Sequence, residues 1–103
     1  SNEKRAQAIL RPYRKQIDDL DDEILKLLAQ RFGIVRKVAR IKTKQGLPSY
    51  LYDRVMEVRN RCVRIGAKQG IDAAFLYGLY SAIIYHSCAT EDEIKMKLEK
   101  KSK

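Results

Sequence analysis

The chain has 103 residues, of which 45% are hydrophobic and 34% are charged, a length and balance typical of one folded domain. No run of 18 apolar residues is present, which excludes a membrane-spanning helix, and no signal segment opens the sequence, so we expect a cytoplasmic protein. The net charge of +9 is compatible with nucleic acid, a membrane surface or a small polyanionic substrate, and charge alone does not choose among them.

Glycine and proline divide the chain into three predicted helices. From Tyr13 to Gln45 the only breaker is Gly33, which a long helix tolerates at a cost of about 1 kcal/mol. A loop at 46–49 follows, then a second helix over about 51–67. Gly70 marks a turn, and Asp72 is a suitable N-cap for a third helix that extends toward Ile94.

No segment alternates as a strand would, so the predicted fold is all-α, a three-helix protomer with one long N-terminal helix. We expect one domain over residues 1–103, with a core of about 8–94. The lysine-rich segment 95–103 is predicted to be a frayed basic tail.

The first helix carries an apolar stripe that predicts association with a second copy. Its members follow at spacings of three and four residues over about four heptads: Leu10, Tyr13, Ile17, Leu20, Ile24, Leu27, Arg31, Ile34, Val38 and Ile41. A helix of this length extends about 50 Å. The residues that remain are too few to cover it within a compact monomer, so we expect an intertwined homodimer.

Arg31 stands within this apolar stripe, where an unpaired guanidinium would be costly. It must meet an anion or bend out to solvent, and spacing alone leaves both possibilities open. Lys42 lies on nearly the same helix face about 16 Å further along, so the two cations could bracket a small anion. Arg14 is about 25 Å from Arg31 and rotated around the helix, so only an antiparallel partner helix could bring it to the same ligand.

The third helix places polar side chains on an apolar face. Ser87 and Glu91 continue the spacing of Leu76, Tyr80 and Ile83, which directs them toward the core. Alternatively, they are the solvated end of a helix, or the segment 90–93 is a capping box that starts another helix. The sequence shows no phosphate loop, zinc pattern or nucleophile motif, so we expect neither a metal nor a cofactor.

Taken together, these charged positions resemble a known family. The segments 13–21, 27–31 and 38–42 are similar to the first helix of the all-α chorismate mutases, which are related to isochorismate–pyruvate lyases. The similarity continues through Asp53-Arg54, through 70–72, and through Ile83-Ile84 ahead of Ser87, and it covers roughly residues 10–93.

The resemblance implies a dimer with two active sites for a small dicarboxylate such as chorismate. Residues from one chain would line each site, and Arg14 would enter from the partner. Lys42, Glu91 and Arg31 would be catalytic, and the substrate-binding set would be Arg14, Arg31, Lys42, Arg54, Val55, Ser87 and Glu91. Rearrangement of chorismate to prephenate requires no nucleophile, metal or cofactor. Such a site holds a reactive conformer and stabilises the charge that develops on the ether oxygen.

Two positions depart from the usual mutase pattern. Val55 replaces a glutamate that accepts a hydrogen bond from the substrate's ring hydroxyl, and this Arg-Val pair is more similar to the lyase. Ser87 is more similar to the mutase. Glu91 replaces a common glutamine and can donate to an ether oxygen only when it is protonated, so we expect activity to rise toward acidic pH. We therefore prefer chorismate mutase activity, with isochorismate–pyruvate lyase activity as the alternative. The 4-amino analogue of chorismate stays open as a substrate.

Two rival interpretations assign the chain a function without catalysis. A basic helical dimer could bind nucleic acid, but the charges are dispersed and Arg31 occupies a core position, so we expect neither nucleic-acid nor membrane binding. A coiled-coil interaction module would give Arg31, Lys42 and Glu91 no shared purpose.

Overall fold

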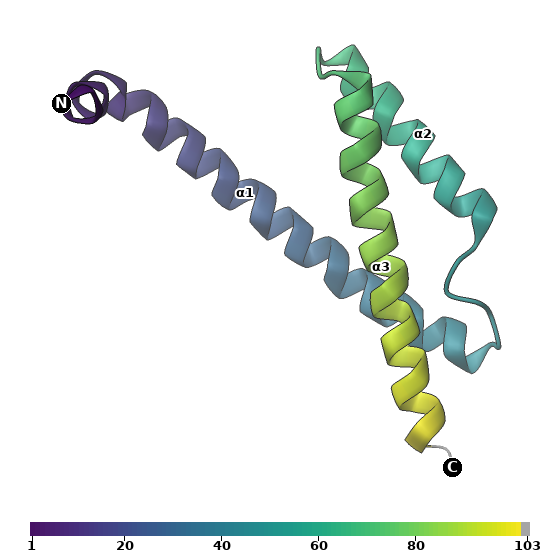
Figure 1. Ribbon diagram of the computed structural model, residues 1–103. Coiled ribbons are helices and arrows are strands. Elements are labelled where there is room, and N and C mark those ends of the chain that lie inside the picture. Colours follow the sequence, from purple (N-terminus) through teal and green to yellow (C-terminus); the bar gives the residue numbers. More distant parts are fainter. Residues whose placement is uncertain (102–103) are drawn as a thin grey trace. The chain divides into compact units, whose positions relative to one another are not determined.

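A computed structural model describes residues 1–101 (Figure 1), which form three helices and, within that range, no strand. These are α1 (Asn2–Lys44), α2 (Tyr52–Lys68) and α3 (Ala73–Lys101). The all-α prediction and the three-helix order are confirmed. The chain divides into two compact units, Ser1–Gly33 and Ile34–Lys103, and each is described by itself.

The first unit is the N-terminal part of α1, which begins earlier than the sequence predicted. Helix starts at Asn2, ahead of the predicted stripe that begins at Leu10, and it includes Pro12. Proline has no N–H to donate to the carbonyl four residues back, and its ring disturbs the preceding turn. Consistent with this disturbance, Arg14 Nη1 lies 3.0 Å from Glu3 Oε1, although eleven residues separate them.

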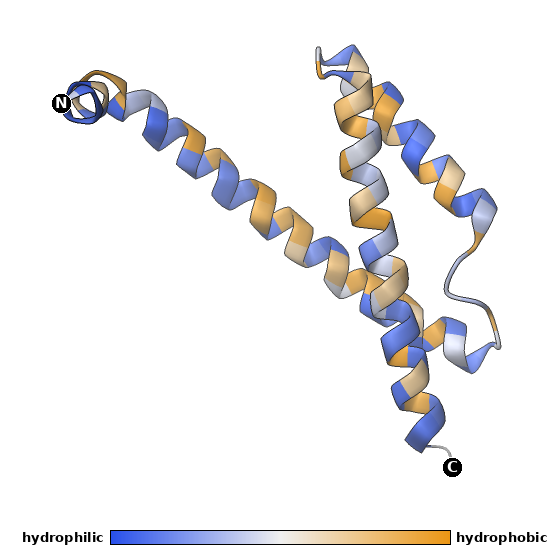
Figure 2. Ribbon diagram, in the orientation of Figure 1, coloured by the Kyte–Doolittle hydropathy of each residue, from blue (hydrophilic) through white to orange (hydrophobic). Residues whose placement is uncertain are grey.

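Hydrophobic residues recur along α1, as the hydropathy colours show (Figure 2). Within the first unit the predicted stripe is open to solvent: Ile17 is 57% exposed, Leu20 63%, Ile24 54% and Leu27 60%. Burying one such side chain fully is worth roughly 1.5–3 kcal/mol, so a row of them favours a covering partner strongly. The stripe predicted from spacing is thus present and uncovered in the single chain.

The second unit is built around the hairpin of α2 and α3, which pack side by side (Figure 1). Helix α2 ends in a Schellman motif: Gly70 has a φ of 84°, and the Ile71 N–H donates to the Gly66 carbonyl at 3.1 Å. The Asp72 carboxylate accepts from the Phe75 N–H at 2.9 Å, so the predicted N-cap is confirmed.

Few large side chains are buried in the second unit. Its buried hydrophobic residues are Ala39, Val55, Leu76 and Ile84. Gly66 allows α2 to approach α3 closely, because a Cβ there would lie 2.4 Å from Leu76 Cδ1.

Helix α3 continues through Lys101, where the sequence predicted a frayed tail from residue 95. Lysine and glutamate are good helix formers, and cations in the last turn interact favourably with the helix dipole. Residues 102 and 103 of the predicted tail lie outside the described residues.

Candidate active site

A buried ion pair joins two of the residues that the sequence singled out. Lys42 Nζ lies 2.9 Å from Glu91 Oε1, and their side chains are only 17% and 7% exposed. The same ammonium donates to the Ser49 carbonyl at 2.9 Å. Two of its three N–H groups are therefore used, one by a carboxylate on α3 and one by the loop between α1 and α2.

The position of Lys42 follows from how α1 ends. Gly46 has a φ of 68°, which favours glycine, and the Leu47 N–H donates to the Lys42 carbonyl at 2.8 Å. This motif stops the helix two residues after Lys42, at Lys44, and folds the loop back beside the Lys42 side chain. The buried Ser49 then presents its carbonyl to the ammonium.

Ser87 and Glu91 lie one turn apart on α3, and each is only 6% exposed. Helix α3 runs unbroken through both residues, so the alternative that residues 90–93 begin another helix is wrong. The alternative that they form a solvated helix end is wrong as well. Ser87 Oγ donates to the Ile83 carbonyl at 2.8 Å, which holds the hydroxyl close to the helix.

The Cys88 thiol lies near the Lys42–Glu91 pair, and both charges affect its pKa. Burial raises the pKa of its thiol, the nearby Glu91 carboxylate raises it further, and the Lys42 ammonium partly opposes both effects. The thiol therefore lies in an environment that disfavours additional negative charge. Cys88 and Cys62 are both free cysteines.

The two candidates on α2 have different surroundings. Val55 is buried, with 5% of its surface exposed, so an apolar side chain occupies the position at which the family resemblance implied a glutamate. Arg54 is exposed and forms an ion pair with Glu57, three residues along the same helix. The Arg54 guanidinium is therefore paired within its own helix and not with the buried Lys42–Glu91 pair.

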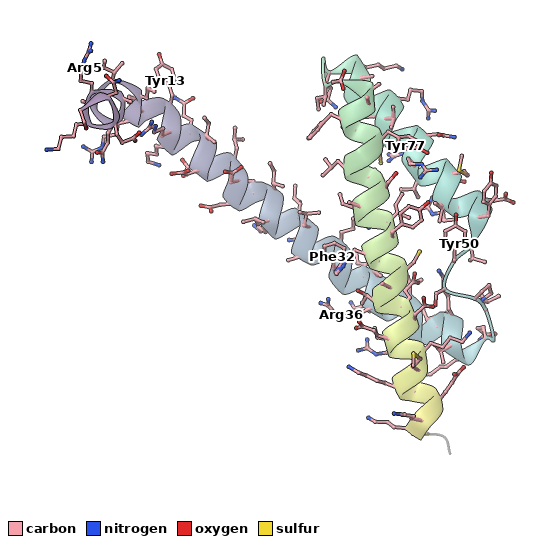
Figure 3. All side chains as sticks on the ribbon, in the orientation of Figure 1. Arg5, Tyr13, Phe32, Arg36, Tyr50 and Tyr77 are labelled. Atoms are coloured by element: carbon pink, nitrogen blue, oxygen red, sulfur yellow. The ribbon has the colours of Figure 1, made fainter. Side chains whose placement is uncertain are left out.

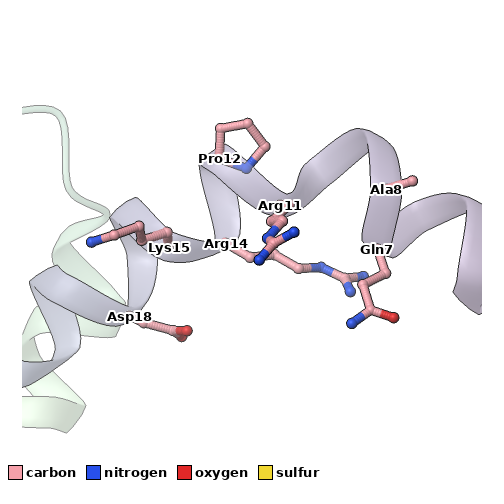
Figure 4. Close-up of a pocket in the computed structure, with 7 residues that line it drawn as sticks. All are labelled: Gln7, Ala8, Arg11, Pro12, Arg14, Lys15 and Asp18. Carbon is pink, nitrogen blue, oxygen red and sulfur yellow. The ribbon is translucent and has the colours of Figure 1, made fainter.

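Arg14 and Arg31 belong to the first unit, apart from the second unit that contains Lys42 and Glu91. Arg14 borders an open hollow at the Pro12 turn, together with the cations Arg11 and Lys15 (Figure 4). Arg14 pairs with Glu3, and the two side chains are 43% and 79% exposed. An exposed pair of this kind is weak, so Arg14 can exchange Glu3 for another carboxylate at little cost.

One buried cation was missed by the sequence reasoning. Arg59 is 6% exposed, and its Cζ lies 4.3 Å from the centre of the Tyr77 ring. Its Nη1 donates to Ser81 Oγ at 3.0 Å and its Nη2 to Met56 Sδ at 3.2 Å, while the buried Nε has no partner. The spacing of four residues from Val55 was the signal that could have placed Arg59 on the buried face.

Over the part of the chain that the structure describes, no three or more histidine, cysteine, aspartate or glutamate side chains gather as a metal site would require. Within the same residues, no helix has the combination of length and apolar character needed to cross a membrane.

Comparison with known proteins shows the family to which the chain is similar. Residues 13–92 match the family described as chorismate mutase type II. The chain is 35% identical to a 4-amino-4-deoxychorismate mutase of Streptomyces venezuelae, over 81% of each protein. It is 30% identical to a chorismate mutase of Methanocaldococcus jannaschii, over 91% of this chain and 95% of that one. A bifunctional chorismate mutase/prephenate dehydratase of Aquifex aeolicus is 32% identical over 84% of this chain, which spans 25% of that protein.

The chain belongs to the type II chorismate mutase family. The family and the names of these relatives favour a mutase, and they do not favour the lyase or the nucleic-acid interpretation.

Proposed function

We propose that this chain is a chorismate mutase that acts as a cytoplasmic homodimer and rearranges chorismate to prephenate without a cofactor. The observation that carries the proposal is the buried Lys42–Glu91 pair within a chain of this family. A cation that is buried, paired and still has one free N–H direction suits a reaction in which an ether oxygen gains negative charge.

The proposed chemistry forms one bond and breaks one. The ether C–O bond breaks while the methylene carbon of the enolpyruvyl group bonds to the ring, and no proton or electron leaves the substrate. Lys42 Nζ would donate to the ether oxygen as that bond lengthens. A preorganised donor in a site shielded from water is worth far more than the same donor in bulk solvent.

The remaining site residues would bind and orient the substrate. Arg31 would bind one carboxylate, and Arg14 of the partner chain the other, through two parallel N–H···O bonds each. Arg54 would leave Glu57 to approach the substrate, Val55 would contact the ring, and Ser87 would supply a hydroxyl near Glu91. Fixing both ends of the substrate favours the compact conformer in which the reacting carbons meet.

The homodimer is supported by the uncovered stripe of α1. Ile17, Leu20, Ile24 and Leu27 are each more than half exposed in the single chain. A second copy of the same helix offers a matching stripe, and an antiparallel arrangement would carry Arg14 to the partner's site. The burial of the α1 stripe and the supply of Arg14 to the active site would then depend on the same dimer interface.

A second candidate is rearrangement of the 4-amino analogue of chorismate. It is supported by the relative from Streptomyces venezuelae, named 4-amino-4-deoxychorismate mutase, with which this chain shares 35% identity. Val55 is compatible with either substrate, because an apolar side chain neither requires a ring hydroxyl nor accepts from a ring amine.

One assay tests the proposal. Purified chain is incubated separately with chorismate, isochorismate and 4-amino-4-deoxychorismate, and products are identified by chromatography and mass spectrometry. Buffer without protein measures the uncatalysed background, and the Lys42→Met variant shows how much of the product depends on the proposed donor. Prephenate from chorismate, well above that background, is the expected result. Salicylate and pyruvate from isochorismate, without prephenate from chorismate, would replace the mutase with the lyase.

A further inference from the structure

The loop between α1 and α2 holds the proposed catalytic ammonium directly. Lys42 Nζ donates to the Ser49 carbonyl at 2.9 Å and contacts Glu91 Oε1 at the same distance. Because the three N–H bonds of an ammonium point in tetrahedral directions, fixing two of them also fixes the third. The direction of the remaining donor therefore depends on where the loop places the Ser49 carbonyl.

An aromatic stack anchors the loop at the next residue. Tyr50, which is labelled in Figure 3, follows Ser49 directly. Its ring lies parallel to that of Tyr85 on α3, with centroids 6.4 Å apart and planes inclined by 5°. This offset parallel arrangement is a favourable one for aromatic rings. One peptide unit thus separates the carbonyl that binds Lys42 from the ring that is stacked on α3.

Other properties of Tyr50 are consistent with a held ring. In the stack each ring is partly covered, with Tyr50 43% and Tyr85 49% exposed. Partial burial and the adjoining Tyr85 phenol raise the pKa of Tyr50.

Both acceptors of Lys42 are therefore tied to the same helix. Glu91 belongs to α3 itself, and the Ser49 carbonyl is held to α3 through the Tyr50–Tyr85 stack. We propose that Tyr50 and Tyr85 are positioning residues of the active site, which hold the Ser49 carbonyl so that the third N–H of Lys42 is aimed at the substrate. This inference rests on the proposed function for its catalytic consequence, but not for its geometry.

Four single variants test the inference. Tyr85→Leu removes the stack from the α3 side, and Tyr50→Leu removes it from the loop side, in case one of them folds poorly. Tyr85→Phe keeps the ring and is the conservative rescue. Leu47→Ala is a matched control, because it shortens an exposed apolar side chain of the same loop. Circular dichroism and thermal unfolding verify that each variant is folded.

Kinetics give the first measurement. Because the bond from Lys42 to the ether oxygen strengthens in the transition state, each Leu variant should lower kcat about tenfold and change KM less than about twofold. Tyr85→Phe and Leu47→Ala should keep the wild-type kcat. An equal loss of kcat in Tyr85→Phe and Tyr85→Leu, or a loss confined to KM, would overturn the inference.

Trace acetylation gives a second measurement that requires no enzyme activity. Lys42 is largely buried in the folded chain, and its modification is compared by mass spectrometry with that of the exposed Lys37. Both Leu variants should raise the relative labelling of Lys42, and Tyr85→Phe should not. Unchanged labelling in the Leu variants would overturn the inference. If the Leu variants raise the labelling of Lys42 but the wild-type chain shows no mutase activity, the positioning role stands and the proposed function is rejected.

Discussion

Lys42 near the end of α1 and Glu91 on α3 form a salt bridge of 2.9 Å that is almost closed to water. Removing two charges from solvent is costly, and their attraction compensates for it only when further hydrogen bonds complete the arrangement. The Ser49 carbonyl supplies one such bond. A pair of this kind is weak evidence for a stabilising role, so the proposed catalytic role has to be tested separately from stability.

Lys42→Met should separate the catalytic role of the pair from its structural one. Loss of a preorganised donor to the ether oxygen should lower kcat by about 10²–10³-fold. The Glu91 carboxylate would be left buried without its cation, which should cost about 3 kcal/mol of unfolding free energy. Chorismate turnover and urea denaturation measure the two effects. The double variant Lys42→Met/Glu91→Leu should recover the stability and leave the activity low. Recovery of both would contradict a catalytic Lys42.

Glu91→Gln tests which form of the side chain acts on the substrate. A carboxyl group can donate to the ether oxygen only when protonated, and the protonated fraction rises as pH falls. The wild-type kcat should therefore increase from pH 8 toward pH 5. An amide donates at every pH, so the glutamine variant should show a flat profile over this range. A flat wild-type profile would remove Glu91 from the role of donor.

Subunit mixing tests whether Arg14 acts in the partner's site. Arg14→Ala and Lys42→Met homodimers should each be almost inactive. After unfolding and refolding together, a mixed dimer would contain one site with both wild-type residues, and random pairing should restore about a quarter of wild-type activity. The same recovery should follow when Arg31→Ala replaces Lys42→Met. No recovery, with mixed dimers verified by native mass spectrometry, would place Arg14 in the site of its own chain.

Local signals predicted much of the second unit correctly. Gly70 and Asp72 mark the turn between α2 and α3, because one permits a left-handed backbone and the other caps the next helix with its own carboxylate. Spacing on α3 placed Glu91 on the buried face, and the structure pairs it with Lys42. These features depend on neighbours within a few residues or on helix periodicity.

Features that depend on distant contacts were not predictable from spacing. The Ser49 carbonyl is a backbone atom, and nothing in the residue type indicates that it accepts from Lys42. The predicted stripe begins at Leu10, and no pattern indicated that α1 already starts at Asn2 and continues through Pro12, a residue that usually marks a helix boundary. Arg59 shares a helix face with Val55, but spacing does not indicate that an aromatic ring and a hydroxyl of the neighbouring helix contact it.

Arg59→Met should stabilise the chain. The guanidinium is buried, one of its partners is a thioether, and its Nε has no acceptor, so an apolar side chain of similar length should raise the unfolding free energy by about 1 kcal/mol. Ser81→Ala should do the opposite and lower it by about 1–3 kcal/mol, since it removes the hydroxyl acceptor of a buried charge. Urea denaturation compares the two variants. Destabilisation by Arg59→Met would mean that the contact with Tyr77 outweighs the cost of burial.

Alkylation of Cys88 provides a measure of the Glu91 charge that does not depend on substrate. Burial and the Glu91 carboxylate raise the pKa of this thiol, so less thiolate is present at a given pH and iodoacetamide should react more slowly than with an unfolded control. The experiment uses the Cys62→Ser background, so that one thiol is followed. Glu91→Gln should shift the midpoint of the rate against pH to lower values, because it removes a negative charge and leaves the Lys42 ammonium.

The raised pKa of Cys88 also makes the free energy of unfolding depend on pH. The folded chain binds the Cys88 proton more tightly than the unfolded chain does, so this contribution is complete below the unfolded pKa and is lost as pH rises through the folded pKa. Cys88→Ala should therefore flatten the alkaline fall of the unfolding free energy measured by urea denaturation above pH 8. If Glu91→Gln left both the alkylation midpoint and this alkaline slope unchanged, the Glu91 carboxylate would not lie beside Cys88 in solution, and the Lys42–Glu91 pair would have to be reconsidered.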